Sequence, residues 1–145
     1  MAPLIVLVTT AAITRLIGWL AGVDPLDSWA GATAAGLAAM FVVTASAHFL
    51  QPRRGALIAM VPARLPSPSA LVTLTGVLEL VGAVGLLVPA TAALAAAGLI
   101  ALLVVMFPAN IRAARAGRGI TTMPLPLRAA VQGGFILACV VVLVG

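Results

Sequence analysis

The chain has 145 residues, of which 63% are hydrophobic and only 8% are charged, a composition that excludes an ordinary soluble domain and indicates one integral membrane unit spanning residues 1–145. Its net charge of +5 comes from eight arginines and no lysine, and because the arginines gather in two loops, this charge indicates membrane topology rather than nucleic-acid binding. With one cysteine, Cys139, and one histidine, His48, the chain excludes an internal disulfide, a cysteine zinc cage and bis-histidine haem ligation, and we expect no metal site.

Five apolar segments are long enough to cross a bilayer, which predicts an all-α helical membrane bundle. They are residues 3–22, 31–50, 70–88, 90–107 and 127–144. The first segment lacks the basic start of a signal peptide and carries Arg15 late, so we interpret it as a true span with Trp19 near one interface. Arg15 either anchors that interface or pairs with an acid, for which Glu79, Asp24 and Asp27 are the candidates.

The second span, 31–50, ends with His48, which shares a helical face with Thr44. A basic loop, 51–68, follows and contains Arg53, Arg54, Arg64 and several prolines. Its short apolar patch, at residues 57–61, is too short to span and is expected to lie in the interface or to dip back toward the bundle.

We expect the third span, 70–88, to be the helix around which the bundle is arranged, because it carries Glu79 at its middle. Its two faces differ. Small and polar residues lie with Glu79 on one face, namely Thr75, Gly76, Gly82 and Ala83, whereas Leu74, Val77, Val81, Val84 and Val88 lie on the other. Glu79 is therefore predicted to point into the bundle, either neutral or paired with a donor. Glu79 then either forms a structural hydrogen bond between helices or acts as a site that binds a ligand or a proton.

The last two spans are joined by a second basic loop. Residues 90–107 are rich in alanine and form an antiparallel hairpin with the third span. They end at Phe107, and Pro108, Ala109 and Asn110 follow. Glycines and prolines in the loop, 111–126, argue against a long helix there. In the final span, 127–144, Gln132 and Cys139 share a face. Gln132 is either an inter-helix hydrogen-bonding group or a ligand contact, and Cys139 is expected to be a small buried residue.

The charges also predict an orientation. Both arginine-rich loops must lie on one side, opposite Asp24 and Asp27, and the positive-inside rule places them in the cytoplasm. We therefore expect a bacterial-type inner membrane protein with a cytoplasmic N-terminus and an external C-terminus. Glu79 would then lie near the midplane and His48 near the cytoplasmic surface. Straight helices separate these two side chains by about 10 Å in depth, so a tilt, a kink or a recessed helix end would be needed to join them.

Several short runs resemble the DoxX-like family of small polytopic membrane proteins. The resemblance covers about residues 31–144, a four-helix core to which the first span is an N-terminal addition. It rests on Ala47-His48-Phe49, Met60-Val61-Pro62, Leu65-Pro66, Thr75-Gly76-Val77-Leu78-Glu79-Leu80, Gly82-Ala83-Val84-Gly85-Leu86-Leu87-Val88-Pro89 and Phe107-Pro108-Ala109-Asn110. The most specific part of the resemblance is the run that begins at Glu79-Leu80 and ends at Pro89. The single cysteine departs from the paired cysteines of some redox-associated relatives, which argues against dithiol chemistry.

The resemblance implies a quinone-linked or other hydrophobic-ligand role, and only Glu79, His48 and Asn110 occupy its polar positions. We expect an accessory subunit that binds a quinone or lipid without a covalent cofactor, in contact with membrane lipids and with other membrane subunits or further copies of itself. Candidate ligand-binding residues are Glu79, His48, Asn110, Arg15 and Gln132. The alternatives are an enzyme using Glu79 and His48 as acid and base on a lipid-soluble substrate, and a purely structural subunit.

Overall fold

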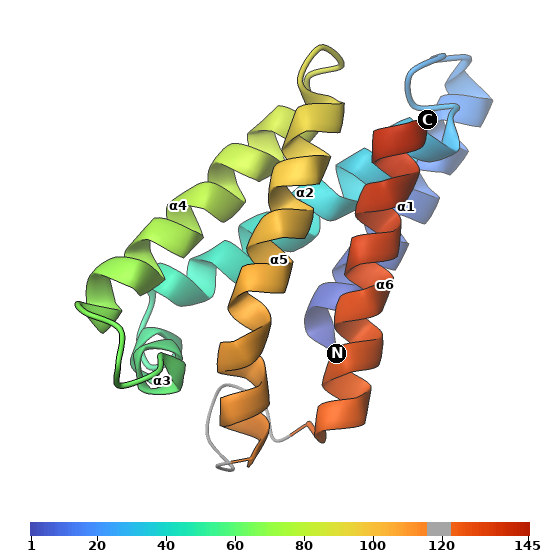
Figure 1. Ribbon diagram of the computed structural model, residues 1–145. Coiled ribbons are helices and arrows are strands. Elements are labelled where there is room, and N and C mark those ends of the chain that lie inside the picture. The colour runs from blue at the N-terminus through green and yellow to red at the C-terminus, as the bar shows by residue number, and fades with distance from the viewer. Residues whose placement is uncertain (116–122) are drawn as a thin grey trace.

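The computed structural model describes residues 1–115 and 123–145, and helices are the only regular secondary structure in this part of the chain, as Figure 1 shows. Five of its helices are long and apolar enough to cross a membrane, which confirms the predicted all-α class and is compatible with a multi-pass membrane protein. The helices are α1 (Ala2–Ala21), α2 (Trp29–Phe49), α3 (Arg53–Met60), α4 (Pro68–Leu86), α5 (Ala92–Arg115) and α6 (Leu125–Val144); α3 is the short one.

Local sequence signals set several helix ends. Gly22 ends α1 with a φ of 64°, a left-handed conformation that suits glycine because it has no Cβ. The Ser28 side chain accepts a hydrogen bond from the Gly31 amide at 2.9 Å and so caps the start of α2. Prolines occupy the first turn of α1, α4 and α6, where a missing N–H costs nothing.

The central helix is α2. Half of the residues in its most apolar window are buried, compared with a third in α4, and it packs against α1, α4 and α6. Leu37, Met40 and Phe41 are almost fully buried in this core, and neighbouring alanines and Gly36 let the other helices approach closely. The expectation that the bundle is arranged around residues 70–88 is therefore wrong, because small residues on several faces of α2 allow it three long neighbours.

The predicted faces of α4 are confirmed. Gly76, Glu79, Gly82 and Ala83 are buried, whereas the valines and leucine of the opposite face are exposed to the surroundings. A Cβ added at Gly82 would lie 2.6 Å from the side chain of Leu99, so the missing side chain allows α4 to pack closely on α5. As expected for a hairpin, α5 begins only a few residues after α4 ends.

One loop prediction needs correction, and the other loop contains a short helix. The helix α5 does not end near Phe107 but continues through Pro108 to Arg115, because a membrane helix tolerates the one backbone hydrogen bond lost at proline and helix-forming alanines follow. Residues 116–122 of the predicted basic loop, including Arg118, lie outside the described residues. In the other basic loop, the apolar patch forms part of α3, which packs against α2, α4 and α5 without spanning.

The two ends of the bundle differ in charge. One end, at the bottom of Figure 1, carries α3 and the last turns of α5 and is called here the arginine-rich end. It holds Arg53, Arg54, Arg64, Arg112, Arg115 and Arg128. The opposite end carries the α1–α2 connection with Asp24 and Asp27, the α4–α5 turn and the C-terminus. The structure thus places the positive charges of its described residues mainly at one end, with Arg15 on the other side.

Candidate functional site

A histidine and a glutamate from different helices meet inside the bundle. His48 Nε2, near the end of α2, lies 3.4 Å from Glu79 Oε1 in the middle of α4, and the two side chains are only 5% and 6% exposed. These side chains were expected to differ by about 10 Å in depth if both helices were straight and ended at the same level. They meet because the end of α2 is recessed along α4, where it lies beside Val72 and Gly76 rather than beside the first residue of α4.

Gly76 makes this close approach possible. A Cβ at position 76 would lie 2.6 Å from His48 Cβ and 2.9 Å from its Cγ, well inside the usual contact distance. Because the last turn of α2 therefore touches the α4 backbone, the imidazole extends along α4 toward Glu79. In the sequence, the position of Gly76 three residues before Glu79 on the same face indicated a close neighbour there but not that α2 would be that neighbour.

The hydrogen bonds around His48 determine its proton arrangement. Its Nδ1 lies 2.8 Å from the carbonyl oxygen of Val72, which can only accept, so Nδ1 carries a hydrogen and donates. Thr44 donates to Glu79 Oε2 at 2.8 Å, which leaves Oε1 to face Nε2. One proton placed between Nε2 and Oε1 satisfies both atoms, and the pair is then neutral overall whichever atom holds it.

Arg54 ties the end of α2 to α4. Its guanidinium donates to the backbone carbonyl of His48 and, through the other terminal nitrogen, to Ser69 O at 3.3 Å and Thr73 Oγ1 at 3.0 Å. Carbonyls at a helix C-terminus lack partners within the helix, and a cation is favourable there. Sequence reasoning placed Arg54 in a basic loop and did not predict this role. The only signal for it in the sequence is that Arg54 lies six residues after His48.

A cavity of about 290 Å³ lies beside the pair at the arginine-rich end. Its walls come from α3, the first turns of α4, the second half of α5 and the segment between α3 and α4. Most of the lining is aliphatic, with His48, Thr75, Arg64 and Asn110 as its polar side chains. Such a mostly apolar cavity with a few polar groups is typical of small-molecule sites. Glu79 is not among the residues that line it, because the His48 ring stands between them.

Asn110 connects this cavity to α6. Its amide nitrogen donates to Gln132 Oε1 at 3.3 Å, and Gln132 in turn donates to the Leu103 carbonyl at 2.8 Å. Gln132 is therefore an inter-helix hydrogen-bonding residue. With Asn110 it also lines a second cavity, of about 270 Å³, beside the first residues of α1. The bond to Gln132 uses one of the two amide hydrogens of Asn110.

The structure does not bring Arg15 to this site. Arg15 pairs with Asp27 in the α1–α2 connection, and its guanidinium lies 5.4 Å from the centre of the Trp29 ring. Of the candidate residues, His48 and Glu79 therefore meet directly, Asn110 and His48 share a cavity, Gln132 supports Asn110, and Arg15 lies at the other end of the bundle.

The geometry favours binding in the cavity over a freely available acid and base. Both ring nitrogens of His48 are occupied, by Val72 O and by Glu79, so the imidazole presents a fixed wall to the cavity. Asn110 has hydrogen-bonding capacity left for a ligand, and Arg64 is exposed at the same cavity. Among the described residues, no three histidine, cysteine, aspartate or glutamate side chains gather as a metal site would require.

Residues 37–143 match a protein family described as a domain of unknown function, DUF8561. The match runs from the middle of α2 to the end of α6 and so includes the His48–Glu79 pair and the cavity, but not α1. No curated protein and no solved structure matches the chain. Because the matched region covers well over half of its length, the chain belongs to the DUF8561 family.

Proposed function

We propose that this protein binds a lipid-soluble ligand with a small polar head, a quinone or a related lipid, in the cavity between α3, α4 and α5. The observation that carries the proposal is the composition of that cavity, in which aliphatic side chains surround a few polar groups that converge at one end of the bundle. An apolar tail would lie against Leu71, Val105 and Met106, and a carbonyl or hydroxyl of the head would meet Asn110.

The support from His48 and Glu79 is indirect but specific. With one proton shared between His48 Nε2 and Glu79 Oε1, the buried pair carries no net charge inside the membrane, and its contact keeps the inner wall of the cavity in one position. The resemblance of residues 31–144 to DoxX-like proteins supports the same ligand class, and it supports a role as an accessory, redox-linked subunit of a larger membrane complex. The charge difference between the two ends supports a cytoplasmic arginine-rich end in a bacterial-type inner membrane.

The test is to identify what the protein holds when it is purified in mild detergent. We expect an extractable quinone or lipid in a fixed ratio to the protein. Ala109→Leu, inside the cavity, is expected to reduce that ratio severalfold, whereas Ala101→Leu, an exposed position on the same helix, leaves it unchanged. Equal ligand content in the two variants would refute this site. A fixed protein partner with no small ligand would instead favour the purely structural role.

A second candidate function, acid–base catalysis on a membrane-dissolved substrate, is favoured by the 3.4 Å contact of His48 with Glu79. It requires Glu79 or the ring to release its present partner during turnover. The ligand extracted above, incubated with purified protein and analysed by mass spectrometry, distinguishes the two functions. An unchanged ligand supports binding, and conversion that is lost in Glu79→Gln supports catalysis.

A further inference from the structure

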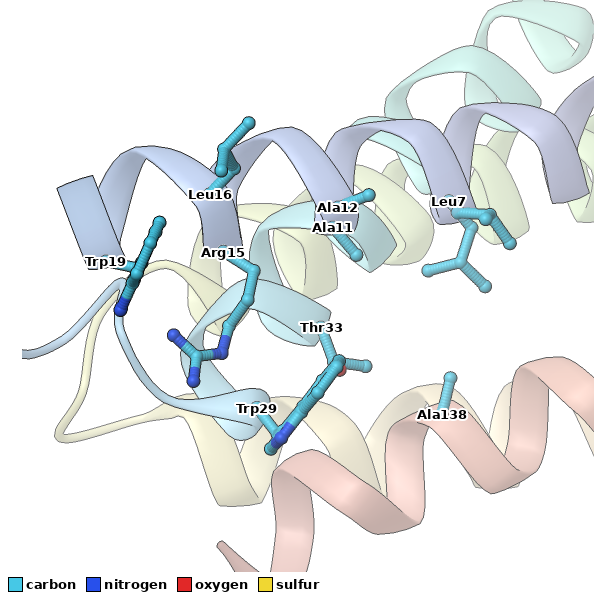
Figure 2. A pocket seen from close by; sticks show the side chains of 10 residues that line it. Leu7, Ala11, Ala12, Arg15, Leu16, Trp19, Trp29, Thr33 and Ala138 are labelled. Carbon is cyan, nitrogen blue, oxygen red and sulfur yellow. The ribbon is translucent and has the colours of Figure 1, made fainter.

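A separate groove lies at the opposite end of the bundle, between α1 and α6, and Figure 2 shows the side chains that line it. Its volume is about 620 Å³. Helix α1 packs against α2, which also packs against α6, so the groove has α2 as its floor and opens to the outside of the bundle. From Arg15 it runs along aliphatic positions of α1, including Val8, Ala12 and Leu16, with Ala138 of α6 on the other wall.

The polar end of this groove is organised around Arg15. Its guanidinium pairs with Asp27 and lies against Trp29, while Trp19 flanks it. Both tryptophans are largely exposed, Trp19 at 66% and Trp29 at 72%. Exposed tryptophans mark the level of the membrane interface. Asp27 pairs with one terminal nitrogen of Arg15, and the Arg15 side chain is 29% exposed, so the guanidinium fork has further N–H donors for an added oxygen ligand.

We propose that this groove binds one phospholipid of the surrounding membrane, with an acyl chain along α1 and α6 and its phosphate on Arg15. The charges at this end specify the headgroup. One cation, Arg15, is accompanied by two acids, Asp27 and the exposed Asp24, so the region is negative overall. A net anionic lipid is disfavoured there, whereas a phosphate joined to a primary ammonium complements both signs. Of the zwitterionic headgroups, a primary ammonium can also donate hydrogen bonds to the carboxylates of Asp24 and Asp27, so we assign a phosphatidylethanolamine-type lipid. This inference does not depend on the ligand proposed for the other cavity.

The direct test is lipid binding to delipidated full-length protein in detergent, measured by native mass spectrometry with dioleoyl phosphatidylethanolamine and dioleoyl phosphatidylglycerol. We expect one ethanolamine lipid to bind in preference to the glycerol lipid. Ala12→Phe fills the groove and is expected to weaken binding about tenfold, since it displaces one or two methylenes of the chain. Ile13→Phe, at a neighbouring position that is also exposed but lies outside the groove, is the control and is expected to bind as the wild type does.

Two further variants keep the proposal testable if Ala12→Phe folds poorly. Val8→Trp blocks the same groove two turns from Arg15, and Arg15→Lys keeps the charge opposite Asp27 but loses the fork, so each is expected to weaken ethanolamine-lipid binding severalfold. The proposal is overturned by equal binding in the groove variants and the Ile13→Phe control, or by a preference for the glycerol lipid. It is equally overturned if a lipid-free dimer dissociates in Ala12→Phe but not in the control, because a second copy would then cover the groove.

Discussion

Gly76→Ala tests the close approach on which the buried pair depends. The added Cβ would lie 2.6 Å from His48 Cβ, whereas carbon atoms in contact are normally about 3.5–4.0 Å apart. The obstacle is the stem of a buried side chain and not its flexible end, so α2 and α4 must move apart by about 1 Å. Overpacking of this kind destabilises by about 1–3 kcal/mol, and the better helix propensity of alanine returns up to about 1 kcal/mol. We expect a net loss of about 1–2 kcal/mol.

The assay is reversible unfolding in detergent micelles, followed by circular dichroism, with Gly98→Ala as the matched control. A Cβ at Gly98 meets nothing within 4 Å, so the control gains propensity without a clash and is expected to be neutral or slightly stabilised. His48 is the only histidine, so its nitrogen NMR signals report the pair directly in the same samples. If Gly76→Ala and Gly98→Ala unfold alike and the His48 signals do not move, the described contact between α2 and α4 is wrong.

Two further predictions concern the pair and the orientation. Glu79→Gln is expected to retain the fold with His48 protonated on Nδ1 only, because the new amide can donate a hydrogen bond to the unprotonated Nε2. Glu79→Ala leaves Nε2 and Thr44 without this partner and is expected to destabilise the protein by about 1 kcal/mol. Equal stability of Glu79→Ala and the wild type would contradict this. The orientation is tested with single cysteines in a Cys139→Ala background, introduced at the exposed positions Asp24 and Arg53. In intact cells, the cysteine at position 24 is expected to react with an impermeant thiol reagent, and the cysteine at position 53 is expected not to react. The reverse labelling pattern would invert the proposed topology.

Patterns local to one helix were readable from the sequence, whereas relations between helices were not. The faces of α4 followed from 3.6-residue periodicity, because small residues at one angular position indicate a close neighbour. The meeting of His48 and Glu79 depends on how far α2 is recessed along α4, a translation that leaves no periodic signal. Polar pairs at four-residue spacing, Thr44 with His48 and Thr75 with Glu79, marked the two faces that meet but not their relative height.

The cavity was beyond sequence reasoning for a related reason. It is formed by segments far apart in the chain, and two of them differ from their predicted form, since α3 folds within a loop and α5 passes through Pro108. A proline near the end of an apolar run indicated a helix end, yet in a membrane the preceding turns and the neighbouring helices can carry the helix through it. Only the continued helix brings Asn110 to the same cavity as His48.

The central position of α2 has a consequence for how the protein is assembled during synthesis. Its mean hydropathy, 1.6, is the lowest of the five spans, because the alanines and glycines that admit its neighbours offer little to lipid. Alone in the bilayer, α2 would be the least favourable span, and two of its partners, α4 and α6, emerge from the ribosome after it. Helix α1 emerges before it, packs along it, and is joined to its start by the Arg15–Asp27 ion pair. We therefore expect α1 and α2 to enter the bilayer together, as a helical hairpin in which the charges of Arg15 and Asp27 are already paired.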